Sequence, residues 1–198
     1  MKTNYVLIDY ENVQPEAIAV LDQEYFKVIV FVGASQAKIT FEVVSALQRM
    51  GARAQYIRIS GNGSNALDFH IAFYIGQLAA QEPDACFHII SNDAGFDPLI
   101  QHLKSKKMRV YRSRDVTDIP IVKAARAESP TEKLAVIVTN LQQRGASKPR
   151  TVQTLSSTIN ALFQRALSDE EVSSLLRTLQ KQGIITVNET EVSYSLPA

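Results

Sequence analysis

The chain has 198 residues, of which 45% are hydrophobic and 21% are charged, and its formal net charge is +1. These values are ordinary for a globular protein and exclude a strongly basic chain, so any nucleic-acid surface has to be local. Its single cysteine, Cys86, excludes an internal disulfide, and no apolar stretch reaches membrane-spanning length. We therefore expect a cytoplasmic protein without a membrane partner.

The first part of the chain alternates between apolar runs and segments with helical spacing. Apolar runs predict five strands, over residues 5–8, 26–32, 54–59, 87–90 and 109–111. Helices are predicted between them, the longest from Leu67 to the break at Pro83. Runs that are apolar on both faces are typical of parallel strands, and right-handed crossovers favour the strand order 3-2-1-4-5. The predicted fold class is a three-layer α/β/α sandwich with a central parallel sheet.

The character of the chain changes near residue 128, which we take as the boundary between domains of residues 1–127 and 128–198. Ser129 and Pro130 fit a helix cap and a first helical position. Helices are then predicted over residues 131–144, 152–163 and 169–182, followed by a hairpin of residues 184–187 and 192–196. Ser168 with Glu171 forms a capping-box pattern. Three helices followed by a hairpin is the order of a winged helix.

Two predicted strands end in an aspartate. Asp9 closes strand one, and Asp93 follows strand four in the run Ser91-Asn92-Asp93. In the expected order these strands are neighbours, and ligands of parallel sheets bind at the carboxyl ends of strands. Two ionised carboxylates held close together repel each other unless a cation lies between them. A hard divalent cation such as Mg²⁺ is the usual solution.

Two further acids can reach the same edge of the sheet. Asp68 lies in the first turn of the helix after a Gly-Asn loop, and Asp97 lies at the start of the helix after strand four. Each also has a purely structural interpretation. Asn65 with Asp68 resembles a cap pair that favours the helix dipole, and Asp97 before Pro98 resembles a helix cap.

The segments Asp9-Tyr-Glu-Asn12 and Ser91-Asn-Asp93-Ala-Gly-Phe96-Asp97-Pro98-Leu99 make residues 4–115 resemble a PIN-like nuclease domain, closest to the NYN branch. The resemblance implies a metal-dependent ribonuclease, a hydrolase that uses Mg²⁺ or Mn²⁺ to cut RNA phosphodiester bonds by metal-activated water. It matches Asp9 to the first family acid, Asp68 to the acid on the central helix and Asp93 to the acid after strand four. We expect all four aspartates to be catalytic and metal-binding, and the RNA to be single-stranded or structured.

One position departs from the family pattern. The NYN pattern often has a second aspartate two residues after the position of Asp93, where this chain has Gly95. Asp97 is the candidate substitute, and if it points away, a catalytically inactive RNA-binding or scaffold protein is the alternative. A phosphohydrolase of the HAD type is a further alternative, but Glu11 stands where that class needs an aspartate. Asn12 could fix Asp9 or bond to a metal-bound water.

Local basic residues are the candidates for nucleic-acid contacts. A run without acids contains Lys104, Lys106, Lys107, Arg109 and Arg112, and it could track a phosphate backbone or form a solvated edge. Lys38 follows strand two on the side expected for the active site. In the C-terminal domain the candidates are Lys148 and Arg150.

The C-terminal domain is similar in outline to the winged-helix modules of the OST/LOTUS type that accompany some NYN domains. Its third helix opens with Asp169-Glu170-Glu171, which would repel phosphates in a DNA major groove. We therefore expect this domain not to read DNA sequence. The pattern leaves RNA binding, a protein partner and a homo-oligomer open as its role.

Overall fold

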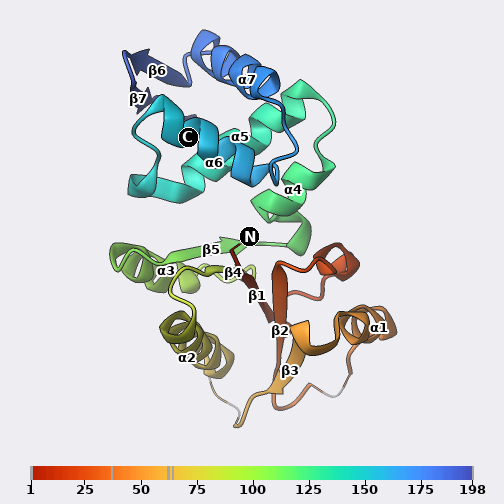
Figure 1. The fold of residues 1–198 in the computed structure, drawn as a ribbon. Coiled ribbons are helices and arrows are strands. Elements are labelled where there is room, and N and C mark those ends of the chain that lie inside the picture. Colours follow the sequence, from red (N-terminus) through yellow and green to blue (C-terminus); the bar gives the residue numbers. More distant parts are fainter. Residues whose placement is uncertain (1, 37, 62, 64, 198) are drawn as a thin grey trace. The chain divides into compact units, whose positions relative to one another are not determined.

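The computed structural model describes residues 2–36, 38–61, 63 and 65–197 (Figure 1). The chain divides into two compact units, residues 1–119 and 120–198. The predicted boundary between residues 127 and 128 differs because helix α4 (Pro120–Arg126) packs against helices of the second unit. In the described residues no helix is both long enough and apolar enough to cross a membrane.

The first unit is built on a five-stranded parallel sheet in the order β3-β2-β1-β4-β5, as the sequence predicted. The central position of β1 explains why residues 5–9 are all buried. The strands are β1 (Asn4–Asp9), β2 (Phe26–Val32), β3 (Ala54–Arg58), β4 (Cys86–Ile90) and β5 (Arg109–Ser113). Because all five strands run the same way, their last residues meet at one edge, called here the carboxyl edge, and their first residues meet at the amino edge.

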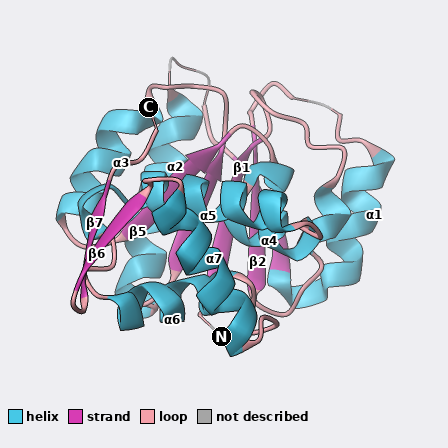
Figure 2. Cartoon of the chain, turned by 90° about the horizontal axis from the view of Figure 1, so that it is seen from above, coloured by secondary structure: helices cyan, strands magenta, loops and turns pink. Residues whose placement is uncertain are grey.

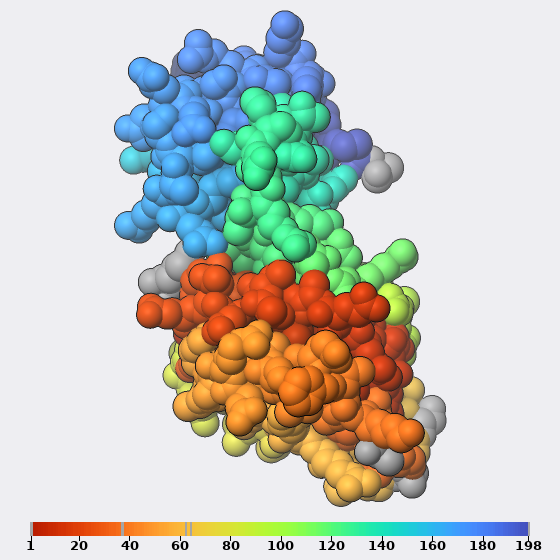
Figure 3. Space-filling model, turned by 90° about the vertical axis from the view of Figure 1, so that its right-hand side faces the viewer, coloured from red at the N-terminus to blue at the C-terminus, as the bar shows by residue number. Residues whose placement is uncertain are grey.

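Helices cover both faces of this sheet, which confirms the three-layer α/β/α fold class (Figures 1 and 2). Helices α2 (Ala66–Gln81) and α3 (Phe96–Ser105) cover one face, where Leu67, Ile71 and Phe96 pack against strand residues such as Leu7. Helix α1 (Phe41–Met50), orange in Figure 3, covers the other face. Short 3-10 helices complete this unit at Ile18–Leu21, Gly51–Arg53 and Val116–Asp118.

The second unit has its own apolar core, which includes Leu141, Leu155 and Leu179. Its further elements are α5 (Pro130–Arg144), the 3-10 helix Gly145–Ser147, α6 (Val152–Leu162), α7 (Asp169–Lys181), β6 (Ile185–Asn188) and β7 (Glu191–Tyr194). Capping boxes at Ser129 and Ser168 explain where α5 and α7 begin. The order of three helices and a hairpin is as predicted.

Candidate active site

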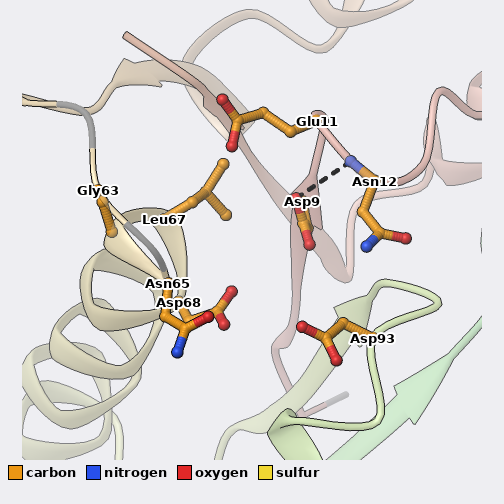
Figure 4. A pocket seen from close by; sticks show the side chains of 9 residues that line it. Asp9, Glu11, Asn12, Gly63, Asn65, Leu67, Asp68 and Asp93 are labelled. Atoms are coloured by element: carbon orange, nitrogen blue, oxygen red, sulfur yellow. Dashed lines mark hydrogen bonds between the residues drawn. The ribbon is translucent and has the colours of Figure 1, made fainter.

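An open pocket lies at the carboxyl edge of the first unit (Figure 4). Four of its lining side chains are carboxylates, contributed by the end of β1, the first turn of α2 and the loop after β4. The lining residues are Asp9, Glu11, Asn12, Gly63, Asn65, Ala66, Leu67, Asp68 and Asp93. The topology therefore brings three of the four predicted aspartates to one place.

Asp9 is the most deeply buried of these acids, with 4% of its surface exposed. Its carboxylate accepts hydrogen bonds from Ser91 Oγ at 2.8 Å and from the backbone N–H of Asn12 at 3.3 Å. Burial raises the pKa of Asp9, and those two hydrogen bonds oppose the rise. Asp9 is thus held in one orientation, and no lysine or arginine of the described residues pairs with it.

Asp93 is joined to Asp9 through the hydroxyl of Ser91. Ser91 Oγ donates to Asp9 and accepts from the backbone N–H of Asp93 at 3.0 Å. The carboxylate of Asp93 then accepts from the backbone N–H of Gly95 at 2.7 Å. A Cβ atom at residue 95 would lie 3.1 Å from Asp93 Oδ1, so glycine gives this turn its room. Gly95 stands where the family pattern often has an aspartate, and in this chain it supports Asp93 through its backbone N–H.

Asp68 faces the other acids from the first turn of α2 (Figure 4). Burial raises its pKa to about 6, and the nearby charges of Asp9, Asp93 and Glu11 contribute to the rise. Asn65 occupies the N-cap position of α2, but its side chain makes no capping hydrogen bond. The structure therefore does not support the interpretation of Asn65 and Asp68 as a simple cap pair.

Glu11 also lines this pocket, although it was not predicted from the sequence as a site residue. Its carboxylate lies directly over Gly33, where an added Cβ atom would fall 1.5 Å from Glu11 Oε1. Gly33 follows β2, the strand beside β1, so the two residues meet across the strand ends. The feature of the sequence that could have predicted this contact is Gly33, just after β2, because a glycine there leaves space for a side chain from the turn after β1.

Asp97, the fourth predicted acid, is not among the residues that line the pocket. Its two carboxylate oxygens accept from Arg112 Nε at 2.8 Å and from Arg112 Nη2 at 2.9 Å. This paired geometry lowers the pKa of Asp97. Helix α3 begins at Phe96 with Gly95 in the N-cap position, so Asp97 is not the helix cap either.

Most of the predicted basic run lies away from the pocket. Lys106, Lys107 and Arg109 lie at or just before the start of β5, which is the amino edge of the sheet, and Arg109 bonds to Asp84 there. Lys104, near the end of α3, lies over the ring of Tyr111 at 5.0 Å. A parallel strand puts its first and last residues at opposite edges, so this run cannot act as one surface beside the carboxylates.

The carboxyl edge has a different set of basic residues. Arg112 lies near the end of β5 and also donates to the backbone oxygen of Ser91 at 3.3 Å. Lys38 is exposed in the loop after β2, as predicted. Arg58, which the sequence analysis did not select, ends β3 and donates to the backbone oxygen of Ala34 at 2.6 Å.

The remaining predicted contacts are polar or lie in the second unit. Asn12 bonds to Asp9 through its backbone, while its side-chain oxygen accepts from the backbone N–H of Asn92 at 3.1 Å. Lys148 donates to the backbone oxygen of Gly145, and Arg150 is exposed just before α6. Both belong to the second unit.

The pocket offers oxygen donors, which are the ligands that a hard divalent cation prefers. In the described part of the chain, no three His, Cys, Asp or Glu side chains lie close enough to hold a metal ion together. Mg²⁺, however, usually takes only one or two carboxylates directly and keeps several waters. In the described residues the carboxylates of the pocket form no ion pair with Lys or Arg, and two of them, Asp9 and Asp68, have raised pKa values. Such a set fits a hydrated cation.

Comparison with known families gives one match. A family model described as PIN domain matches residues 3–113, more than half of the chain and nearly all of the first unit. Searches of curated proteins and of solved structures found no significant match.

Proposed function

Since the chain belongs to the PIN-domain family, whose members are usually metal-dependent nucleases that bind nucleic acid, we propose that it is a metal-dependent ribonuclease of the NYN branch. The segments Asp9-Tyr-Glu-Asn12 and Ser91-Asn-Asp93 support the branch. The cofactor we propose is Mg²⁺ or Mn²⁺, and the reaction is hydrolysis of RNA phosphodiester bonds in the cytoplasm.

One observation carries this proposal: acids that repel one another line a single open pocket. The pKa of Asp68 is raised by burial and then by the charges of Asp9, Asp93 and Glu11. A fold tolerates such repulsion at a site where a bound cation relieves it. The ion pairs in the described residues use other acids, namely Asp22, Glu82, Asp84, Asp97 and Glu171.

Asp9, Asp68 and Asp93 are the residues we assign to the cation. Asp9 is oriented by Ser91 and by the N–H of Asn12, and Asp93 is oriented by the N–H of Gly95. A cation bound there supplies Lewis-acid polarisation of the phosphodiester and a more acidic water. Glu11 contributes a further negative charge from the β2 side.

Asp68 also has the properties of a group that exchanges a proton near neutral pH. Its pKa of about 6 leaves it largely ionised at pH 7 but able to take up a proton at moderate cost. A bound cation would lower this pKa, so we assign the proton exchange to the cation-free protein, in which ionised Asp68 is ready to bind the cation.

Phosphate groups next to the scissile bond would meet the basic residues of the carboxyl edge. We propose Lys38 and Arg58 as direct contacts, because Arg58 ends β3 and Lys38 lies in the loop that follows β2. Arg112 is a positioning residue: it holds Asp97 in a two-point ion pair, and its own pKa is raised first by Asp97 and also by the charge of Asp93. In this proposal Asp97 does not bind the cation. It fixes Arg112, which also bonds to the backbone of Ser91.

The second unit is proposed to be a winged-helix module of the OST/LOTUS kind. A bridge between Thr151 and Glu191 adds a strand-like contact before α6, and the hairpin of β6 and β7 follows α7. Lys148 and Arg150 stand at the start of this arrangement and are its candidate RNA contacts. Basic residues before α6 suit this role better than α7, whose first turn carries three acids.

The direct test is cleavage of mixed-sequence single-stranded RNA with Mg²⁺ or Mn²⁺, with and without a chelator. We expect cleavage that the chelator abolishes and that the double variant Asp9→Asn/Asp93→Asn loses by roughly a hundredfold or more. Asp84→Asn is the matched control, because Asp84 is an aspartate of the amino edge. Full activity in the double variant would refute the catalytic assignment.

A non-catalytic RNA-binding protein is the second candidate. It is favoured by the pairing of Asp97 with Arg112, and by the fact that no three acids of the described residues lie close enough to hold a metal ion together. Salt-sensitive RNA binding without cleavage under any divalent cation would establish it. Cleavage that depends on Asp9 and Asp93 would exclude it.

A further inference from the structure

The outer face of α2 is apolar and exposed. Phe69 and Phe73 are 71% and 64% exposed, although the helix already buries Leu67, Ile71 and Ile75 in the core. A surface helix of a globular protein normally has polar side chains on its outer face. Among the 16 residues of α2, the only Asp, Glu, Lys or Arg is Asp68. Apart from Gln77 and Gln81, the exposed residues of the helix are therefore apolar.

Four of the six exposed residues of α2 form one narrow stripe, and Gln77 and Gln81 lie beside it. Phe69, Phe73, Gly76 and Ala80 are all exposed, and a rotation of 100° per residue places them within a sector of roughly 60°. Two large side chains lie towards the N-terminal end of the stripe and two small residues lie towards its C-terminal end. The stripe, defined by these four residues, is thus divided into knobs and holes.

Contacts within the described chain do not explain why residue 76 is a glycine. A Cβ atom at this position would have no described heavy atom within 4 Å, and the residue lies in the middle of an exposed helix. Its φ is not in the left-handed region that favours glycine. Glycine in a helix interior costs about 1 kcal/mol relative to alanine. A glycine at such a place fits a close approach by something outside the chain.

We propose that the stripe is the contact surface for a second copy of this chain, with the two α2 helices packed antiparallel about a twofold axis. In an antiparallel pair the two residue numbers in contact have a constant sum. The same register then sets Phe69 against Ala80 of the partner subunit and Phe73 against Gly76 of the partner subunit. Each contact occurs twice, as a twofold interface requires. Every large side chain meets a small residue.

Charge favours a second copy over a nucleic acid at this face. Helix α2 has no lysine or arginine to neutralise phosphates, and Asp68 in its first turn would repel them. An uncharged face, in contrast, meets its own copy without like-charge repulsion. Because Asp68 lies at the N-terminal end of α2, the two carboxylate pockets of the dimer lie at opposite ends of the helix pair.

The first experiment is sedimentation equilibrium over a range of protein concentrations. We expect the wild-type chain to reach twice its mass of 22.0 kDa, with dissociation as the protein is diluted through the micromolar range. Gly76→Leu should remain a monomer and keep its thermal stability, since leucine is a better helix former and meets open space in one chain. Gln101→Leu, on the exposed surface of α3, is the matched control and should still form dimers.

The second experiment tests the antiparallel register. Residues 69 and 80 of one helix are about 16 Å apart, too far for a disulfide within one chain. Oxidation of Phe69→Cys/Ala80→Cys should therefore give a covalent dimer, while each single variant, which also contains Cys86, should give none. A monomeric wild type at every concentration, or dimers of Gly76→Leu, would overturn the proposal. A monomer that loses RNA affinity in Phe73→Ala would instead identify a base-stacking surface.

Discussion

The two edges of the parallel sheet treat their acids in opposite ways. At the amino edge, Glu82 accepts from Lys27 Nζ at 2.6 Å and from Tyr5 Oη at 2.7 Å, and its pKa falls to about 2. Asp84 at the same edge pairs with Lys2 and Arg109. At the carboxyl edge the acids of the pocket have one another as neighbours, and the pKa of Asp68 rises to about 6.

The acids at the amino edge are thus paired with lysine or arginine, whereas those of the pocket have no such pair among the described residues. An acid paired with lysine or arginine contributes modestly to stability when it is exposed. In the pocket Asp9 is buried and Asp68 is partly buried, and repulsion from their neighbouring acids reduces stability in the absence of a cation, so their presence needs another reason. The comparison predicts that divalent cations act on the carboxyl edge alone, and that protons act there near pH 6 but act on the amino edge only at much lower pH.

The largest effect is expected from a divalent cation. At a hundredfold excess over its dissociation constant, Mg²⁺ or Mn²⁺ should stabilise the fold by about 2.7 kcal/mol, or about 5–10 °C in melting temperature. Asp9→Asn/Asp93→Asn should abolish this shift while raising the melting temperature of the cation-free protein. Differential scanning fluorimetry measures both values. An equal shift in the double variant would place the cation elsewhere.

A smaller effect is expected from pH, through Asp68. Its pKa is raised from 3.8 to about 6, so the cation-free protein should lose stability as pH rises from about 4 through 6. Cation binding needs the ionised carboxylate, so the affinity for Mg²⁺ should fall about tenfold between pH 7 and pH 5. Calorimetric titration at both pH values checks this. In Asp68→Asn the dependence on pH should flatten over this window.

At the amino edge, the loss of Lys27 should reduce stability by about 0.5–1 kcal/mol at pH 7, since the pair with Glu82 is partly exposed to solvent. The lowered pKa of Glu82 means that its contribution is complete above pH 4.5 and is lost as pH falls towards about 2. Urea unfolding of Lys27→Met should therefore differ from the wild type at pH 7 and converge with it near pH 2. RNA cleavage should not change.

The smallest effect is expected at Gly33. In Gly33→Ala the new Cβ atom would displace the flexible carboxylate of Glu11, with a loss of cleavage of about twofold. Gly63→Ala is the matched control, because it lines the same pocket but meets no described atom within 4 Å. Single-turnover rates compare the two variants. Equal rates would show that the position of Glu11 does not matter for the reaction.

The sequence predicted the features of the site that depend on strand order. The apolar runs and the right-handed crossover rule gave the order 3-2-1-4-5, and that order brings the ends of β1 and β4 together. Asp9 and Asp93 therefore lie at neighbouring strand ends, where Ser91 links them, and Asp68 lines the same pocket from α2.

The features that depend on a choice between side-chain partners were not predictable in this way. Asp97 lies only four residues after Asp93, so the sequence alone made it a candidate for the pocket. In the structure it pairs instead with Arg112, 15 residues further on, because α3 packs on β5. The basic residues were misplaced for a different reason. Lys106 and Lys107 precede β5, so the predicted topology already assigned them to the amino edge.

The hydrogen bonds that link the loops after β1 and β4 bear on the proposed reaction through preorganisation of the site. Asn12 accepts from the backbone N–H of Asn92, and Ser91 bridges Asp9 to the backbone of Asp93. Both links are made within the protein, so the rim of the sheet is preorganised before any ligand arrives. Little reorganisation energy then remains to be supplied at the moment of reaction.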